Sequence, residues 1–228
     1  MKLSTSKGRT GVGTAVTLFV VFLLALAAWL YFRLGPQLFH PGVRPAAFQL
    51  PAPLDLASLP TATRFDFPLG SEHGALTYNA TLFTEDNHLG EDLNGIGGEN
   101  SDFGDAIYAI ADGRVLYTGD GGPGWGNIVM VLHACEEDGV RKYLQSYYAH
   151  VDTIHVASGQ NVRRGEQIAT VGSAGGRYWA HLHFEMREFL TPFIGPGYRE
   201  DPSGWINPTE FIQQHRGAPE EDVGRPPL

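Results

Sequence analysis

Apolar and polar residues alternate in short runs along most of the chain, a pattern that predicts β-strands rather than helices. Two such runs cover residues 128–133 and 142–150. Between them stands Glu137-Asp138-Gly139, whose residue types strongly favour a tight turn. The sequence therefore predicts a β-hairpin near the middle of the chain.

Further short strands are expected over residues 64–69, on either side of Asp112-Gly113, and as a pair formed by Val162 and residues 168–171. The 29 glycines and 15 prolines supply the turns between them. Strands at spacings of roughly 8 to 12 residues are typical of antiparallel sheets. We therefore predict a mainly β domain over residues 63–190, folded as an antiparallel sandwich or an open barrel-like sheet.

The N-terminal pattern is different, because residues 11–32 form an uncharged and mostly apolar run. Its length is close to the ~20 residues of a membrane-spanning helix. Lysine and arginine in residues 1–10 favour a cytoplasmic N-terminus and an exported body. The alternative is a cleaved signal peptide, since Ala25-Leu26-Ala27 offers a small-residue cleavage pattern. The domain is expected outside the cytoplasm in both cases, membrane-anchored in the first and secreted in the second.

Two segments flank the predicted domain. Residues 33–62 carry six prolines without sustained periodicity, which is typical of a semi-extended linker. Residues 191–228 form a C-terminal extension rich in Pro and Gly. One short helix is expected there at residues 208–215, with Asn207 as its N-cap and a proline in its first turn.

Charge and cysteine content narrow the possible functions. The net charge is −9 and the body of the chain has no basic run, which argues against nucleic acid as a partner. Cys135 is the single cysteine, so an intramolecular disulfide and a cysteine-based zinc site are both excluded. A metal ion in this chain would have to be held by histidines and carboxylates.

Residues 181–185, HLHFE, combine strand periodicity with such groups. In a β-strand His181, His183 and Glu185 share one face, and the other face can pack into a core. The two imidazoles start roughly 7 Å apart and can lean towards one metal ion. Glu185 could orient a ligand imidazole or form a surface salt bridge.

A second stretch, residues 88–95 (HLGEDLNG), places His88 four residues before Asp92. On a straight strand these side chains would start roughly 13 Å apart, too far to share one ion, so the chain must bend, and Gly90 permits the bend. His150 at the end of a predicted strand is a further candidate. Catalytic zinc takes three protein ligands, so the five groups together would leave two to act on substrate or water.

These motifs occur in an order and spacing that resembles the lysostaphin-type zinc metalloendopeptidases, which cut peptides of bacterial peptidoglycan. The resemblance covers about residues 64–188 and includes HLGEDLNG, GDAIYAIADGRVLYTG, GWGNIVMVLH, YYAH, SGQNVRRGEQIATVGSAGG and HLHFEMR. It implies one Zn²⁺ per chain bound by His88, Asp92 and His183, with His150 and His181 as unliganded catalytic histidines.

The resemblance leads to the expectation of an endopeptidase that hydrolyses peptidoglycan stems or cross-bridges with a metal-activated water. A non-catalytic module that binds the wall or activates a separate hydrolase is one alternative, and a zinc protease for an envelope protein is another. Residues 94–102 form a long, polar and Gly-rich loop after Asp92, which is expected to line or cover the cleft. A regulatory protein partner would be compatible with any of these functions.

Overall fold

The computed structural model describes residues 19–26, 53–188 and 194–217. The chain divides into two units, Met1–Gly42 and Val43–Leu228. Residues 19–26 of the first unit are helical, with exposed apolar side chains. Most of the anchor expected at residues 11–32 lies outside the described residues. No helix within the described part of the chain has the length and apolar character needed to cross a bilayer.

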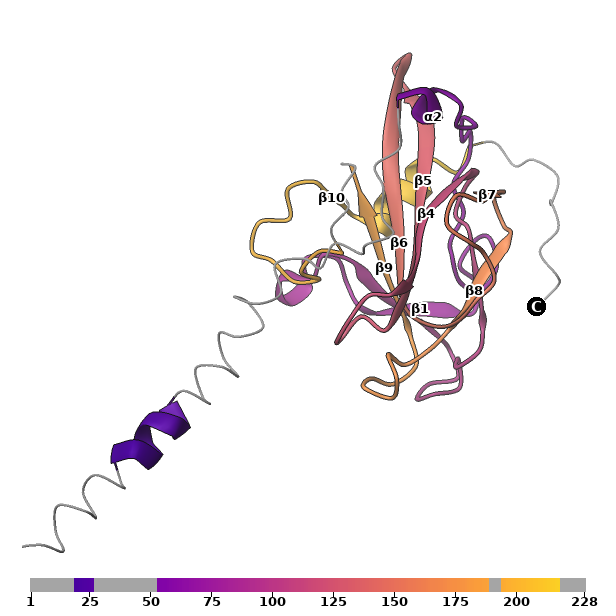
Figure 1. Ribbon diagram of the computed structural model, residues 1–228. Coiled ribbons are helices and arrows are strands. Elements are labelled where there is room, and N and C mark those ends of the chain that lie inside the picture. Colours follow the sequence, from indigo (N-terminus) through magenta and orange to yellow (C-terminus); the bar gives the residue numbers. More distant parts are fainter. Residues whose placement is uncertain (1–18, 27–52, 189–193, 218–228) are drawn as a thin grey trace, which may run out of the picture. The chain divides into compact units, whose positions relative to one another are not determined.

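The second unit is a mainly antiparallel β-sheet domain (Figure 1). Its strands are β1 (Thr77–Thr81), β2 (Glu91–Gly95), β3 (Ala106–Tyr108), β4 (Gly113–Asp120), β5 (Asn127–Glu137), β6 (Val140–Ile154), β7 (Asn161–Val162), β8 (Gln167–Val171), β9 (Leu182–Arg187) and β10 (Trp205–Ile206). The main path of the sheet runs β1-β2-β9-β6-β5-β4-β7, while β8 pairs with β3 and β6, and β10 pairs with β9.

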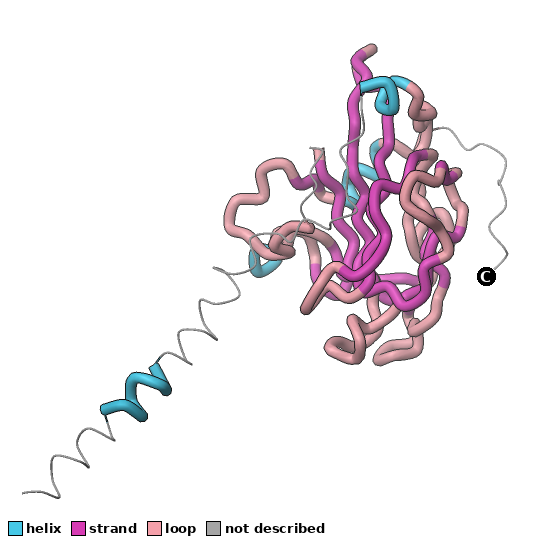
Figure 2. The backbone as a smooth tube through the Cα atoms, viewed as in Figure 1, coloured by secondary structure: helices cyan, strands magenta, loops and turns pink. Residues whose placement is uncertain are grey.

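The predicted hairpin is confirmed and forms the centre of the sheet. Strands β5 and β6 pair from Glu137↔Val140 at the turn to Asn127↔Val151, with one bulge. The tip of the hairpin projects beyond the neighbouring strands (Figure 1). Irregular segments join the shorter strands that surround the hairpin (Figure 2). Asp138 and Gly139 both have positive φ, which explains why the sequence uses these residues at the turn.

Both faces of the central strands are buried. Along β5, Val129 and Val131 contribute to one core cluster, whereas Ile128, Met130 and Leu132 contribute to another. The period of two therefore divides the strand between two cores. In β9 the residues Leu182, Phe184 and Met186 belong to the first core, and the alternate residues face the second one.

Two strand predictions were wrong. Residues 64–69 form no strand, although Phe65 and Leu69 are buried. The Phe65 and Asp66 N–H groups donate to the carbonyls of His215 and Ile110, so this extended segment packs on the core without joining a ladder. The pair expected from Val162 and residues 168–171 does not form either, because β7 pairs with β4 and β8 pairs with β3 and β6.

The segments that flank the sheet also contact it. Helix α2 (Pro53–Ala57) and the residues after it belong to the predicted linker, yet Leu59 is buried in the second core. The N–H of Ala62 donates to the Ala134 carbonyl of β5 at 2.6 Å. The helix expected at residues 208–215 is present as α3 (Pro208–Gln214), and the side chain of Asn207 caps it by accepting from the Glu210 N–H.

Candidate metal centre

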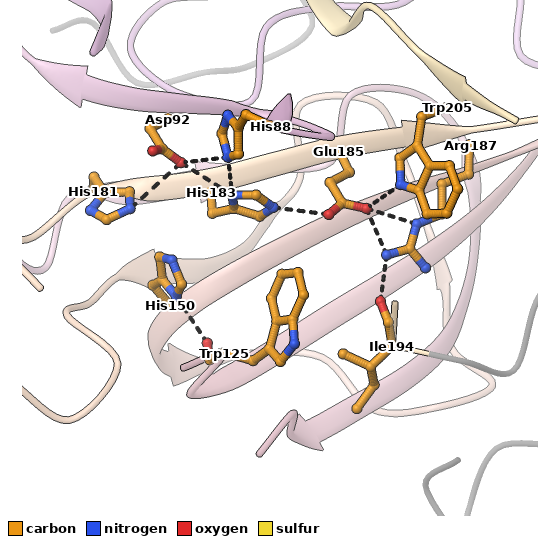
Figure 3. A network of polar contacts seen from close by, with 10 residues as sticks. All are labelled: His88, Asp92, Trp125, His150, His181, His183, Glu185, Arg187, Ile194 and Trp205. Atoms are coloured by element: carbon orange, nitrogen blue, oxygen red, sulfur yellow. Dashed lines mark hydrogen bonds and ion pairs between the residues drawn. The ribbon is translucent and has the colours of Figure 1, made fainter. Parts of the chain in front are cut away.

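Pairing of β9 with β2 and β6 brings two of the candidate ligands, Asp92 and His183, together. Asp92 of β2 lies directly opposite His183 of β9, which in turn lies opposite Ala149 of β6. Residues opposite each other in an antiparallel pair point to the same face of the sheet. The Asp92 Oδ1 atom therefore lies 3.1 Å from His183 Nδ1 (Figure 3).

His88 reaches the same point because the chain turns before β2 begins. A single 3₁₀ turn, η1 (Glu85–Asn87), precedes it, and the Leu89 N–H donates to the Gly197 carbonyl. Gly90 then passes very close to β9, where a Cβ atom would lie 2.5 Å from the Phe184 carbonyl oxygen. The bend that the spacing of His88 and Asp92 requires is thus present, and the absence of a side chain at Gly90 allows it.

The three candidate ligand atoms have the spacing that a metal ion requires. His88 Nε2 lies 2.9 Å from His183 Nδ1 and 3.4 Å from Asp92 Oδ1. Ligand atoms around a tetrahedral zinc ion, with bonds of about 2.0 to 2.1 Å, lie about 3.3 Å from one another. His88, Asp92 and His183 could therefore hold a metal ion. A donor set of two imidazoles and one carboxylate fits zinc.

Behind His183 lies a buried ionic network (Figure 3). His183 Nε2 donates to Glu185 Oε1 at 3.0 Å, and Glu185 Oε2 accepts from Arg187 Nε and from Trp205 Nε1 at 2.9 and 2.7 Å. Arg187 Nη2 also donates to the Ile194 carbonyl. Glu185 and Arg187 are both 0% exposed, so a surface salt bridge is excluded for Glu185. The carboxylate orients the imidazole by binding Nε2, so that Nδ1 of His183 faces Asp92 and His88.

His150 and His181 flank the three ligand atoms. His150 Nδ1 lies 3.0 Å from the Trp125 carbonyl, and His181 Nδ1 lies 2.8 Å from the Trp179 carbonyl. A carbonyl can only accept, so each Nδ1 carries a proton, and in the neutral ring the lone pair is on Nε2. His181 Nε2 lies 3.6 Å from Asp92 Oδ1. The two rings are 4.7 Å apart between centroids and meet edge to face.

The backbone of His150 is itself unusual. Its φ of 62° lies in the left-handed region, which costs a non-glycine residue of order 1 kcal/mol or more. The same Trp125 carbonyl accepts from the His150 backbone N–H at 2.9 Å and from its ring. These two hydrogen bonds hold the residue in this conformation and fix the direction of its side chain.

The pKa values reflect burial and mutual charge. Burial lowers the pKa of His150 to about 3, with help from the neighbouring His183 and His181, so His150 is neutral at pH 7. Burial and the charge of His183 also lower the pKa of His88. For Asp92, burial raises the pKa, but the hydrogen bond with His183 and the nearby histidines outweigh it and hold the pKa well below its usual range. Asp92 is therefore ionised and can neutralise part of a cation's charge.

The pKa of Glu185, which lies behind His183, is set by the same two effects. Burial raises the pKa of the Glu185 carboxyl, while Arg187, His183 and Trp205 together overcome this and lower the pKa to about 2. Hydrogen bonds to Asp92 and Glu185 likewise outweigh burial at His183 and raise its pKa to about 9. Two carboxylates thus stabilise positive charge at this position.

The structure brings all five predicted site residues into one group. The other described histidines make contacts elsewhere: His73 with Glu72, His133 with Ser146 and Asp112, and His215 with Glu137. His155 is exposed, and His40 lies outside the described residues.

Aromatic residues border the candidate site as well. The ring of Tyr198 lies 4.9 Å from that of His88, and the ring of Tyr178 lies 4.9 Å from that of His150. Trp125 packs against His183 at 5.2 Å. Tyr178 and Tyr198 are 41% and 56% exposed, so they are available to a ligand. Both lie in loops outside the motifs, and no local pattern marks them.

Comparison with known proteins adds a family assignment. A family model described as peptidase family M23 matches residues 87–194. The murein hydrolase activator NlpD of Escherichia coli strain K12 is 46% identical over 84 residues, which is 37% of this chain and 20% of that protein. The lipoprotein NlpD of Yersinia enterocolitica is 42% identical over 84 residues, or 78% of that protein. The chain spans about a fifth of the length of the first curated relatives that it matches.

Solved structures give weaker similarity. The antimicrobial peptidase lysostaphin from Staphylococcus simulans matches with a TM-score of 0.42 and 20% identity, over 75% of this chain and 56% of that chain. A zinc-containing peptidase from Vibrio cholerae matches with a TM-score of 0.44 and 24% identity, over 61% of this chain and 41% of that one.

Proposed function

Because the chain belongs to peptidase family M23, we propose that it is a zinc-dependent endopeptidase that hydrolyses peptide bonds in peptidoglycan. One observation carries the proposal. Three ligand atoms lie at the mutual distances of a tetrahedral site, and two further imidazoles present Nε2 lone pairs beside them. Buried titratable groups are costly to keep, and such clusters are typical of catalytic sites.

In the proposed mechanism His88 Nε2, Asp92 Oδ1 and His183 Nδ1 would hold the zinc ion. Zinc bound by three protein ligands supplies Lewis acidity to an attacking water and to a peptide carbonyl. One of the two flanking histidines, His150 or His181, would accept the proton of the water at Nε2 and return it to the leaving amine, because Nδ1 of each ring is already bound to a carbonyl. The same two rings can hydrogen-bond the developing oxyanion once protonated.

The choice of peptidoglycan as substrate rests on relatives. Proteins described as murein hydrolase activators are 46% identical over 84 residues, and a cell division protein, DipM of Caulobacter vibrioides, is 42% identical over 84 residues. Murein is peptidoglycan, so the matched segment occurs in proteins that act at the wall. Exposed aromatic rings such as Tyr178 and Tyr198 provide walls for an extended peptide.

The names of these relatives also favour a second candidate function. A module that activates a separate murein hydrolase would use the same fold to dock a partner, and it would need neither a bound metal nor the two flanking imidazoles. We rank it second because this chain has all five groups, arranged as hydrolysis requires.

The test combines metal content with digestion of purified peptidoglycan by the full-length chain. We expect about one zinc per chain and new peptide termini, and mass spectrometry of the products would identify the bond. His183→Ala should abolish both, because it removes a central ligand. His155→Ala is the matched control, since His155 is exposed and outside the site, and it should retain both.

Two other results would contradict the endopeptidase. Wild-type protein that holds zinc but releases no peptide termini, while it stimulates a purified murein hydrolase, would make the chain an activator. Cleavage that persists undiminished in zinc-free His183→Ala would show that the site is not the catalytic centre.

We also propose that the domain works in the cell envelope, outside the cytoplasm. Relatives described as lipoproteins, including outer membrane antigenic lipoprotein B of Histophilus somni at 42% identity over 86 residues, support this location. The expected anchor at residues 11–32 stays a prediction. Fractionation tests it: an anchored chain should need detergent for release, whereas a processed one should lack residues 1–27 and be soluble.

A further inference from the structure

The loop between β2 and β3 reaches the segment that precedes His181. The Asn100 Oδ1 atom accepts from the Ala180 N–H at 2.7 Å, and the Asn94 Nδ2 atom donates to the Ala180 carbonyl at 3.1 Å. The two loops lie side by side at the end of the domain opposite the hairpin tip (Figure 1). The sequence led us to expect a loop that lines or covers the cleft, and the structure shows that this loop binds the backbone next to His181.

These contacts act on two successive peptide groups. The first joins Trp179 to Ala180: its N–H donates to Asn100, and its carbonyl accepts from the ring of His181. The second joins Ala180 to His181: its carbonyl accepts from Asn94, and its N–H donates to the Gly172 carbonyl at 3.3 Å. Each peptide group is therefore held at both of its polar ends.

The planarity of the peptide group connects Asn100 to the His181 ring. In a planar trans peptide the N–H and the C=O point in opposite directions, so fixing one fixes the other. Asn100 therefore sets the direction of the Trp179 carbonyl. That carbonyl binds Nδ1 of His181 and so sets the direction of the ring, whose Nε2 lies 3.6 Å from Asp92 Oδ1.

The loop is itself well fixed. Asp102 is 1% exposed, and its Oδ2 atom accepts from the Gly95 N–H at 3.3 Å and from Asn94 Nδ2 at 3.4 Å. The end of the loop is bound to β8, because the Gly104 N–H donates to the Val171 carbonyl. Asn94 and Asn100 can thus act as a rigid support.

We propose that Asn100, assisted by Asn94, is a positioning residue that holds the His181 ring in its working orientation through the Trp179–Ala180 peptide group. The predicted effect of Asn100 on the rate of hydrolysis rests on the endopeptidase function proposed above. The predicted effect on the orientation of the His181 ring is independent of that function. Asn100 contacts neither the substrate nor the candidate ligand atoms in this proposal, so metal binding should not depend on Asn100.

The test uses Asn100→Ala and Asn100→Asp in the full chain. Asn100 is exposed, so neither change disturbs the core. Asn100→Ala removes the acceptor, whereas the aspartate retains an oxygen in its place. Asn161→Ala is the matched control, because Asn161 is also exposed and accepts a side-chain hydrogen bond, from Arg114, on strand β7.

For Asn100→Ala we expect unchanged zinc content and KM and a kcat lowered about tenfold, the effect of one hydrogen bond of typical net strength. The ¹⁵N-detected NMR signal of the His181 ring should change from a hydrogen-bonded Nδ1–H to a mixture of tautomers. Asn100→Asp should restore both readouts, and Asn161→Ala should alter neither.

An unchanged ring signal in Asn100→Ala, or an Asn100→Asp ring signal that matches the alanine variant, would overturn the proposal. If wild-type protein cuts no peptidoglycan, the NMR comparison still decides the positioning role, and only the proposed enzymatic function fails. The two failures are therefore distinguishable.

Discussion

Replacing Arg187 with methionine tests whether the buried network behind His183 supports both stability and metal binding. Arg187 is 0% exposed and donates to Glu185 and to the Ile194 carbonyl, with its guanidinium carbon 4.4 Å from the centre of the Tyr147 ring. Methionine fills similar space but has no charge. The variant leaves the Glu185 carboxylate buried with hydrogen bonds from His183 and Trp205 but without the guanidinium that is its closest charged partner.

The expected loss is large because a buried carboxylate would lose its permanent countercharge. Removing one partner of a buried ion pair costs about 3 to 5 kcal/mol. A loss of this size is a large fraction of the roughly 5 to 15 kcal/mol that stabilises a typical domain. At roughly 2 to 4 °C per kcal/mol for a domain of this size, Tm should fall by about 10 °C. Lys142→Met, which breaks an exposed pair with Glu137, should lower Tm far less, because water screens such a pair.

A double-mutant cycle separates stability from metal binding. Glu185→Leu alone should also be destabilising, because it removes the carboxylate that balances the charge of Arg187, whereas the double variant Glu185→Leu/Arg187→Met removes both charges and should recover most of the loss. Zinc affinity should still fall roughly 10- to 100-fold in the double variant, because His183 has lost the carboxylate that orients it.

Urea denaturation with a chelator present measures stability without the contribution of bound metal, and competition with a chelating dye measures zinc affinity. A double variant as unstable as the sum of the two single variants would refute the reasoning. Wild-type zinc affinity in the double variant would show that Glu185 does not support His183.

Three further predictions concern the site and its surroundings. His150→Ala and His181→Ala should each retain zinc and lose about 10²- to 10⁴-fold in hydrolysis, and loss of zinc in either variant would place that residue among the ligands. Burial lowers the pKa of His133 from 6.5 to about 4, so the free energy of unfolding is highest above pH 6.5 and falls by about 3 kcal/mol as the pH drops towards 4. His133→Gln should flatten this pH dependence in urea titrations, and an unchanged dependence would contradict the prediction. Gly90→Ala should lower the free energy of unfolding by about 1 to 3 kcal/mol and weaken zinc binding, because the new Cβ atom would collide with the Phe184 carbonyl and push β2 away from β9. Thermal melts and dye competition that match the wild type would contradict this prediction.

The central hairpin could be predicted because its signals are local. Alternating residues define β5 and β6, and Asp138 and Gly139 adopt the positive φ that the turn requires. Strand pairing between distant segments has no such signal, which is why β7 and β8 were wrongly paired with each other. The apparent strand at residues 64–69 fails for a related reason, since alternate burial also arises where an extended segment packs on a core without a partner strand.

The residues of the candidate site could be predicted, but the structure that surrounds them could not. Arg187 continues the alternation of His183 and Glu185 on β9, so its position on that face is readable from the sequence. Trp205 and the Ile194 carbonyl come from segments after β9, and they reach Glu185 and Arg187 only because the chain folds back over that face. No spacing rule predicts such contacts.

The sequence cannot distinguish the roles of His181 and His183, because both have the same phase in one apparent strand. In the structure the surroundings of the two histidines differ, because strand pairing begins between them. Strand β9 starts at Leu182, so His183 is held between β2 and β6 and faces Asp92, while His181 precedes the ladder and has only an isolated bridge to Gly172. Its ring is free to turn towards the Trp179 carbonyl, whereas the ring of His183 is bound by Glu185. The acceptor binds Nε2 of His183 but Nδ1 of His181, so opposite nitrogens of the two rings face Asp92, in keeping with the different roles that we propose for them.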